Sequence, residues 1–360
     1  MLTPATAQNR LERIASARRA VLDDGLASAD ALAPWVERSW RRCLAAGLSA
    51  QTPLEFTRLG GADQRLALEA SAQLVKSAQA VLSSLTRAIV NTRYFAILTD
   101  AQGIVIDAQG AIDAHDRRAQ LITRVGTDLS EARVGTTAIC TALVEQHPVW
   151  LHRGEHFFET TSVYSCAGAP LIGPDGRCVG MLDLTGVDAP ERPELMHLVA
   201  QSARKIQNAL VQDTPHHLLL RLNWPGDSLG SDADGLLALD ADGWVVGANP
   251  VARQLVPGLS NASPAQVHAR DLFGLPFEHL FDAAHTQVPF ELPLWSGLHL
   301  QALSLPSGRR DGPASLALRD VQSALIRKAL TDAHGNVGQA AKALGISRAT
   351  LYRRLHQRKP

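Results

Sequence analysis

The chain has few cysteines, few aromatic residues and no long apolar run. Its 360 residues include four cysteines, no two of which form a Cys-x-x-Cys pair, and this fits a reduced cytoplasm better than a disulfide framework. No uninterrupted apolar run approaches the ~20 residues that a membrane-spanning helix needs. Residues 1–20 contain four arginines but lack the apolar core of a secretory signal. The sequence therefore predicts a cytoplasmic protein without a membrane partner.

Motifs for catalysis and for nucleotide binding are missing as well. No Ser/His/Asp order and no paired-carboxylate pattern rises above chance for this composition. The chain also has no Gly-x-x-x-x-Gly-Lys-Ser/Thr loop, whose amides and lysine hold nucleotide phosphates. We therefore expect a protein that is not an enzyme and does not use ATP.

Histidine and cysteine patterns fit structural roles better than metal or redox chemistry. His152 and His156 have the spacing of two metal ligands on one helix face, but Gly154 between them argues against a helix there. Cys140 and Cys166 have no adjacent basic cluster that would lower a thiol pKa, so small buried side chains are favoured over redox sensors. A free methionine sulfoxide reductase would need paired resolving cysteines. We expect no metal and no other cofactor.

The most informative positive feature is the segment Gly335–Leu355, which predicts two helices joined by a tight turn. Gly345 stands where a short turn needs a left-handed backbone. Ser347 can cap the second helix, and Leu351 and Leu355 share one face of it. The start of such a second helix is where a helix-turn-helix meets the major groove of DNA.

Charge is distributed along the chain in a way that supports DNA binding. The segment 321–360 has eight basic side chains and one acidic one, a net charge of +7. The whole chain has 35 basic and 35 acidic residues, so residues 1–320 total −7. Positive potential is thus concentrated where phosphates would be engaged, which makes double-stranded DNA the expected partner.

The remainder predicts an α+β, multidomain organisation. Helical periodicity covers residues 5–32, 35–43, 63–92 and 194–212. Pairs of short apolar runs split by Asp/Gly turns predict three β-hairpins: residues 94–107, 167–184 and 235–249. A small-residue helix, 135–145, and a polar loop, 152–165, separate the first two hairpins. Alternating hairpins and helices favour antiparallel sheets.

The C-terminal segment resembles the Fis-type helix-turn-helix that ends many bacterial enhancer-binding regulators, especially over GNVGQAAKALGISRATLYRRL. In that family the preceding helix helps to dimerise and the second helix enters the major groove. The resemblance implies a homodimer and the following DNA contacts: Gln339, Ser347, Arg348, Thr350, Tyr352, Arg353 and Arg354. Gly338 departs from the polar residue often found in the first motif helix.

The rest of the chain resembles regulators of the acetoin-catabolism type. Residues 35–48 look like the SWxRCxxxGL signature that opens these proteins. Residues 135–143, 154–157 and 165–170 look like their GAF sensor domain, and the hairpin with Asn249 looks like the start of a PAS domain. The resemblance implies a small-molecule effector held by these GAF residues: Thr137, Cys140, His156, Cys166 and Asp183. Thr137 and Cys140 depart from the usual GTNAIGTAL, so a relative's ligand does not transfer.

These observations divide the chain into six segments. They are a helical N-terminal segment (1–62), a GAF domain (63–212), a linker (213–230), a PAS-like domain (231–305), a second linker (306–317) and an all-α Fis-type domain (318–360). Members of the resembled family usually carry an AAA+ ATPase before the helix-turn-helix, and the interval 249–320 is far too short for one.

The expected function is a ligand-responsive DNA-binding transcriptional regulator that acts by occupying its operator without its own ATPase. The alternative is a DNA-bound scaffold or co-regulator. Expected protein partners are RNA polymerase or a related, ATPase-bearing sigma-54 activator.

Overall fold

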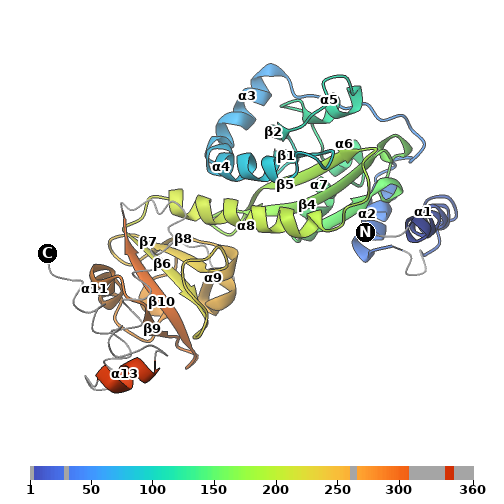
Figure 1. Ribbon diagram of the computed structural model, residues 1–360. Coiled ribbons are helices and arrows are strands. Elements are labelled where there is room, and N and C mark those ends of the chain that lie inside the picture. The colour runs from blue at the N-terminus through green and yellow to red at the C-terminus, as the bar shows by residue number, and fades with distance from the viewer. Residues whose placement is uncertain (1–3, 28–31, 260–265, 308–336, 344–360) are drawn as a thin grey trace.

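The computed structural model describes residues 4–27, 32–259, 266–307 and 337–343. Its main features are two five-stranded antiparallel sheets, preceded by helices and joined by one long helix (Figure 1). The first sheet and its helices, residues 61–213, are here called the first unit. The second sheet and its helices, residues 218–306, are called the second unit. This confirms the predicted α+β organisation with antiparallel sheets.

Two helices precede the first unit and are here called the N-terminal clasp. The first, α1 (Pro4–Arg18), continues into a short π-helix, η1 (Arg19–Asp23), and the second is α2 (Pro34–Ala45). Pro34 occupies the first turn of α2, where its missing N–H costs nothing. Gly47, with a φ of +79°, follows the end of α2, where glycine often terminates a helix.

The predicted helical stretch 63–92 is two helices. They are α3 (Gly61–Ala70) and α4 (Ala72–Ala88), which meet at Ser71. No residue of α3 is buried, whereas α4 buries Leu74, Leu82 and Leu85 against the sheet. The apolar periodicity that identified this stretch therefore belongs to α4.

The first sheet has the strand order β2-β1-β5-β4-β3. Its strands are β1 (Tyr94–Asp100), β2 (Val105–Gly110), β3 (Val149–His152), β4 (Tyr164–Ile172) and β5 (Cys178–Val187). The β1–β2 and β4–β5 pairs confirm the first two predicted hairpins. The edge strand β3 was not predicted, because it directly precedes the polar stretch that was read as a loop.

Helices cover both faces of the first sheet. The helices after α4 are α5 (Arg117–Thr123), α6 (Glu131–Val134), α7 (Ala138–Glu145) and α8 (Leu195–Asp213), with 3₁₀ turns η2 (Arg153–Glu155) and η3 (Glu159–Thr161). One apolar core joins α4 and α8 to one face. A second core joins α5, α7 and the clasp to the other face. The helix α8 packs on β4 and β5 and also reaches β7 of the second unit (Figure 1).

The second sheet has the order β8-β7-β6-β10-β9. Its strands are β6 (Leu218–Asn223), β7 (Gly235–Leu239), β8 (Val245–Ala248), β9 (Phe290–Pro293) and β10 (His299–Pro306). Its helices are α9 (Pro250–Leu255), η4 (Pro257–Leu259), α10 (Ala269–Leu272) and α11 (Glu278–Thr286). The β7–β8 pair confirms the third predicted hairpin. The PAS-like assignment of this unit stays a prediction.

The predicted linker 213–230 is wrong for residues 218–223, which form β6, the central strand of the second sheet. Pro215, Pro225 and Gly226 led to that prediction, but they flank the apolar run Leu218–Leu222 and bound the strand. The second unit therefore begins before residue 231. Most of the second predicted linker, 306–317, lies outside the described residues.

The turn of the β4–β5 hairpin touches the second unit. The carbonyl oxygen of Pro174 accepts hydrogen bonds from the Ala248 amide at 3.0 Å and from Arg253 Nη2 at 2.9 Å. On α8, Asn208 Oδ1 accepts from Asn249 Nδ2 at 2.8 Å. Two parts of the first unit, a hairpin turn and a helix, are thus bonded to the segment 248–253.

Near the C-terminus the structure describes one helix, α13 (Val337–Ala343), within the predicted first helix of the helix-turn-helix. In the described part of the chain, no helix has both the length and the apolar character that a bilayer crossing requires.

Candidate ligand-binding cavity

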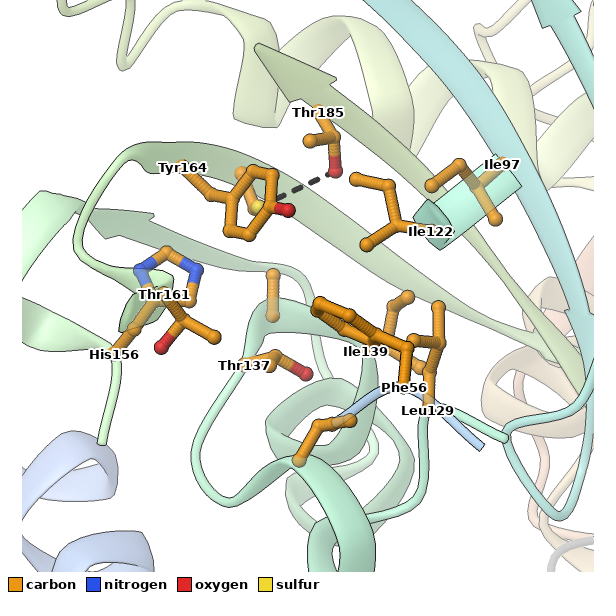
Figure 2. Close-up of a pocket in the computed structure, with 13 residues that line it drawn as sticks. Phe56, Ile97, Ile122, Leu129, Thr137, Ile139, His156, Thr161, Tyr164 and Thr185 are labelled. Atoms are coloured by element: carbon orange, nitrogen blue, oxygen red, sulfur yellow. Dashed lines mark hydrogen bonds between the residues drawn. The ribbon is translucent and has the colours of Figure 1, made fainter. Parts of the chain in front are cut away.

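A small cavity lies between the first sheet and the N-terminal end of α7 (Figure 2). Its volume is about 30 Å³, enough for one or two water molecules. The lining is largely apolar with a few polar groups, the usual composition of a small-molecule site. The lining residues are Phe56, Ile97, Ile122, Leu129, Val134, Thr137, Ala138, Ile139, His156, Thr161, Tyr164, Cys166 and Thr185.

Two paired strands supply the polar floor of the cavity. Cys166 on β4 stands opposite Thr185 on β5, and its Sγ lies 3.3 Å from the Thr185 Oγ1. Tyr164, two residues before Cys166, points to the same side, and its hydroxyl donates to the Arg118 carbonyl at 3.2 Å. Burial raises the pKa of the Cys166 thiol well above its ordinary value. The thiol therefore stays protonated and acts as a small, weakly polar wall group.

Asp183 lies on the same face of β5 as Thr185 but is not among the lining residues. Its side chain is fully buried, and Oδ2 accepts a hydrogen bond from the Thr185 hydroxyl. Its Oδ1 has no hydrogen-bond partner among the described residues. Burial raises the pKa of Asp183 to about 7. A chain of polar groups therefore runs from Cys166 through Thr185 to a buried carboxyl group beside the cavity.

His156 presents a hydrogen-bond acceptor in the cavity wall. Its Nδ1 lies 2.9 Å from the Arg153 carbonyl oxygen, so Nδ1 carries the proton and Nε2 carries a lone pair. This buried Nε2 has no partner among the residues that the structure describes. Burial lowers the pKa of His156 to about 4, with a smaller contribution from Arg18. The imidazole is therefore neutral near pH 7, and a ligand hydroxyl could donate to it.

The N-terminal end of α7 forms the opposite wall. Thr137 caps this helix, because its Oγ1 accepts from the Cys140 amide at 3.4 Å. Gly135 precedes it with a φ of +61°, and a Cβ there would lie 2.8 Å from the Phe157 Cβ. The Cys140 thiol contacts the Gly135 carbonyl at 2.9 Å and Thr137 Oγ1 at 2.8 Å. Burial raises its pKa to about 12, so it serves as a neutral packing group.

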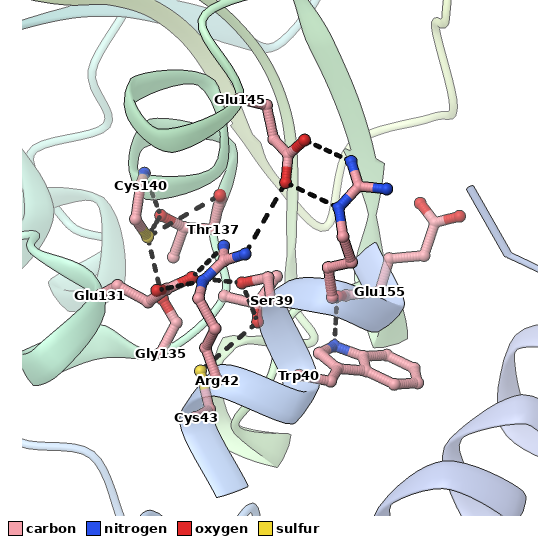
Figure 3. Close-up of polar contacts among 12 residues, drawn as sticks. Ser39, Trp40, Arg42, Cys43, Glu131, Gly135, Thr137, Cys140, Glu145 and Glu155 are labelled. Carbon is pink, nitrogen blue, oxygen red and sulfur yellow. Dashed lines mark hydrogen bonds and ion pairs between the residues drawn. The ribbon is translucent and has the colours of Figure 1, made fainter. Parts of the chain in front are cut away.

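The clasp holds the segments that carry Thr137 and His156. On α2, Ser39 Oγ bonds the Thr136 hydroxyl at 2.7 Å, and Arg42 forms a two-pronged ion pair with Glu131 (Figure 3). Trp40 Nε1 donates to the Glu155 carbonyl at 3.0 Å. The SWxRC residues at 39–43 thus contact two segments, 131–137 and 153–157, which overlap the sensor motifs 135–143 and 154–157 of the sequence analysis.

Three of the five predicted effector residues line the cavity and two do not. Thr137, His156 and Cys166 are lining residues, whereas Cys140 and Asp183 lie outside the lining. The prediction that the latter two contact the effector directly therefore has no support from the cavity. Thr161, Tyr164 and Thr185 were missed. Side chains alternate between the two faces of β4 and β5, so Tyr164 and Thr185 could have been identified once the face toward the cavity was known.

The paired histidines do not share a helix face. His152 ends β3 and its Nδ1 bonds Ser165 Oγ at 2.8 Å, while His156 follows the 3₁₀ turn η2. Within residues 4–27, 32–259, 266–307 and 337–343, no group of three or more His, Cys, Asp or Glu side chains could hold a metal ion.

Of the predicted DNA contacts, Gln339 lies on α13 and is exposed. The other six, Ser347, Arg348, Thr350, Tyr352, Arg353 and Arg354, lie outside the described residues. Their roles stay predictions.

Comparison with known proteins places this architecture in a class of bacterial transcriptional regulators. The model "Bacterial regulatory protein, Fis family" matches residues 317–357, and the model "MimR, N-terminal domain" matches residues 6–208. Since the second match covers more than half of the chain, this protein belongs to the family of regulators with a MimR-type N-terminal domain, and its C-terminal segment is a Fis-family helix-turn-helix.

Similar curated proteins are named as regulators. The acetoin catabolism regulatory protein of Cupriavidus necator is 32% identical over 272 residues, which are 73% of this chain and 39% of that protein. The propane 2-monooxygenase operon activator MimR of Mycolicibacterium goodii is 27% identical over 58% of this chain and 35% of its own length. The chain thus spans little more than a third of these relatives. The Escherichia coli DhaR(N)–DhaL complex gives a TM-score of 0.48 at 16% identity, covering 76% of this chain and 100% of that one.

Proposed function

We propose that this protein is a ligand-responsive, sequence-specific DNA-binding regulator that acts by occupying its operator. The observation that carries the proposal is the presence, on one chain, of a Fis-family segment and a small, mostly apolar cavity lined by a histidine with an unused hydrogen-bond acceptor. Effector binding in the cavity changes the relative pose of two DNA-binding segments in a homodimer. Two such segments on half-sites about one helical turn (~34 Å) apart supply the contacts that one small helix-turn-helix lacks.

The DNA-binding role is supported by charge and by the family match. The net charge of +7 over residues 321–360 coincides with the match at 317–357. Arg348 and Arg353 lie five residues apart, so they do not face the same base. We assign base reading to Arg348 and phosphate binding to Arg353, the former worth about 1–3 kcal/mol of discrimination.

The DNA test compares Arg348→Ala with Arg353→Ala on an operator selected from genomic fragments by the full chain. Arg348→Ala should weaken operator binding more than random-duplex binding, whereas Arg353→Ala should weaken both alike. Fluorescence anisotropy at several salt concentrations measures both. Equal losses for Arg348→Ala on the two duplexes would overturn its base-reading role.

The cavity lining supports a particular chemical class of effector. Its lining is mostly apolar, its His156 is neutral near pH 7, and the free Nε2 accepts a hydrogen bond. A small, uncharged molecule with at least one hydroxyl or N–H donor matches this set. Similar proteins are named for acetoin catabolism and for a propane 2-monooxygenase operon, and of the two molecules in these names acetoin, an uncharged hydroxyketone, matches this set.

The effector test is a thermal-shift screen of the full chain against small alcohols, hydroxyketones and diols. His156→Phe keeps an aromatic ring but removes the acceptor, so it should abolish stabilisation by any hit. His197→Phe, at an exposed position of α8, is the matched control and should leave the response intact. Hits that stabilise His156→Phe as strongly as the native protein would move the effector site elsewhere.

Operator occupancy without ATP hydrolysis is supported by the sequence, which has no phosphate-cradling Gly-x-x-x-x-Gly-Lys-Ser/Thr loop. Operator affinity should be the same with and without ATP and magnesium, and the purified chain should show no ATPase activity. Regulation then comes from blocking polymerase, recruiting it, or competing with an ATPase-bearing relative.

A further inference from the structure

The clasp packs against the one wall of the cavity that carries the unused acceptor. The Arg18 guanidinium, at the end of α1, donates hydrogen bonds to the carbonyl oxygens of Gly154, His156 and Phe157, at distances between 2.5 and 2.9 Å. The same group lies 5.5 Å from the centre of the Trp40 ring on α2. Arg18, on α1, is thus fixed between Trp40 of α2 and three carbonyl groups of the wall segment 153–157.

Two further contacts hold the same segment from the clasp side. Trp40, which is fully buried, donates from Nε1 to the Glu155 carbonyl. Arg10 on α1 binds both carboxylate oxygens of Glu155, at 3.0 and 3.1 Å, and also pairs with Glu191. Glu155 in turn accepts the His152 amide at 2.6 Å. Main-chain and side-chain atoms of the wall segment are therefore bonded to α1 and α2.

The clasp also holds the second polar wall. Ser39 bonds Thr136, which directly precedes the cap residue Thr137, and Arg42 pairs with Glu131 in the same segment. His156 and Thr137 are the two cavity residues whose neighbours in sequence bond to the clasp. They lie on segments with little secondary structure of their own. A free loop of this kind would sample many conformations.

We propose that the clasp completes the effector site: Arg18 and Trp40 are positioning residues that hold segment 153–157 with His156 Nε2 facing the cavity, and release of the clasp opens that wall. The inference rests on the proposed function, since it concerns the same cavity. It deepens that function by making the N-terminal helices part of the site. Effector binding and clasp docking then stabilise each other.

Cysteine labelling tests this without any effector. Cys166 lines the cavity, and Cys178 lies half-buried near the far end of the same hairpin. The full chain is treated with methyl methanethiosulfonate, quenched and digested, and labelling of each cysteine is followed by mass spectrometry. Loss of three charge-assisted hydrogen bonds in Arg18→Ala should raise the Cys166 rate, relative to Cys178, by about tenfold or more.

The controls separate positioning from a general loss of stability. Arg13→Ala removes the same charge from an exposed position of α1 and should leave Cys166 protected. Arg18→Lys, which keeps a charged donor, should restore most of the protection. Trp40→Phe keeps the ring beneath Arg18 but loses the bond to Glu155, so it should give an intermediate rate.

The outcomes distinguish this proposal from the effector proposal. Equal Cys166 labelling in Arg18→Ala and Arg13→Ala would overturn the role of the clasp and leave the cavity as the effector site. If Arg18→Ala unfolds, Cys178 and Cys166 will react alike, and the test then depends on Trp40→Phe and Arg18→Lys. Native-like protection of Cys166 in Trp40→Phe would count against the proposal. Stabilisation by effector that survives His156→Phe would contradict the proposed function alone.

Discussion

Both five-stranded sheets are antiparallel, but their inner faces carry different kinds of side chain. The inner face of the second sheet is mostly leucine, as in Leu218, Leu220 and Leu222 of β6. The corresponding face of β5 in the first sheet carries Asp183 and Thr185 between apolar residues. Burying polar groups costs free energy unless they are hydrogen-bonded, so their presence on this face points to a functional role.

The buried polar groups of the two units also differ in how completely they are bonded. Asn249 in the second unit uses both oxygen lone pairs and both amide hydrogens, on Leu236, Ala252, Asn208 and Asp234. In the first unit, Asp183 Oδ1 and His156 Nε2 have no partner among the described residues. The buried amide of Asn249 is thus fully bonded within the second unit, whereas the first unit leaves one acceptor on a cavity-lining residue, His156, and another on Asp183 beside the cavity. The exception in the second unit is Ser304, discussed below.

The largest loss of stability is expected from a substitution at a close contact between two strands of the first sheet. A Cβ at Gly180 on β5 would lie 2.2 Å from the Thr99 carbonyl oxygen, and backbone atoms cannot move away cheaply. Gly180→Ala should lower the free energy of unfolding of the first unit by about 3 kcal/mol or more. Urea unfolding measures this. Gly61→Ala, where a Cβ meets nothing within 4 Å, is the control and should be neutral or slightly stabilising.

The next effect concerns Asp183 and depends on pH. Burial raises its pKa to about 7 when folded, whereas an unfolded aspartate titrates near ~3.9. The folded state therefore holds a proton that the unfolded state releases, and this contribution to stability is present below about pH 4 and lost as pH rises to about 7. The difference in free energy of unfolding between Asp183→Asn and the native protein should therefore shift in favour of Asp183→Asn by about 3–4 kcal/mol from about pH 4 to about pH 8.

Urea unfolding of both proteins across that pH range measures the difference. His152 and His156 have pKa values lowered by burial to about 3 and about 4. Their contribution is present above ~6.5 and lost as pH falls through those values, in both proteins alike. A stability difference between Asp183→Asn and native protein that does not change with pH would contradict the raised pKa.

Removing one hydroxyl from each unit should have opposite effects. Ser304 on β10 is fully buried and its Oγ has no partner among the described residues, so Ser304→Ala should stabilise by about 1 kcal/mol. Thr185→Val removes the hydroxyl that donates to Asp183 and should destabilise by about 1–2 kcal/mol. Thermal unfolding of the two variants measures both. The same sign for both would show that the polar groups of the two units are equivalent.

The smallest effect is expected on the surface of the clasp. Arg41 pairs with Glu37 one turn earlier on α2, at 2.7 Å, and both side chains are partly exposed. Arg41→Ala should cost less than about 0.5 kcal/mol, because solvent and salt screen such pairs. A loss as large as that of Thr185→Val, by the same thermal measurement, would show that α2 is held through this pair as well as through its buried face.

The sequence predicts the local features of the fold well. The hairpins follow from apolar runs split by Asp/Gly turns, as at Asp100, whose Oδ1 accepts the amides of Gln102 and Ile104. The Thr137 cap, which was not predicted, and the glycine after α2 depend on equally local features of the sequence. The strand β6 was missed because prolines on both sides resemble a linker, and its partners β7 and β10 are recognised only through pairing.

The site was predicted less completely, because it depends on contacts between distant residues. Ser39 and Thr136 are 97 residues apart, and Arg18 and His156 are 138 apart. Ser39, Thr136 and His156 lie in segments that resembled family motifs, whereas Arg18 does not, and nothing in the motifs predicted these contacts. Tyr164 and Thr185 were missed for a related reason: alternation defines two faces of a strand, and only the packed helix α7 distinguishes the cavity side.

The docked turn of the β4–β5 hairpin limits how such proteins can be recombined. The Pro174 carbonyl oxygen accepts hydrogen bonds from the Ala248 amide and the Arg253 side chain. The two strands that this turn connects carry Cys166 and Thr185 in the cavity floor. A chimaera that exchanges the sensor half at the end of α8 would replace one side of this joint and keep the other. Grafts should therefore carry the turn, residues 173–177, together with residues 248–253. Insertions in that turn are expected to separate the two halves even when each folds correctly.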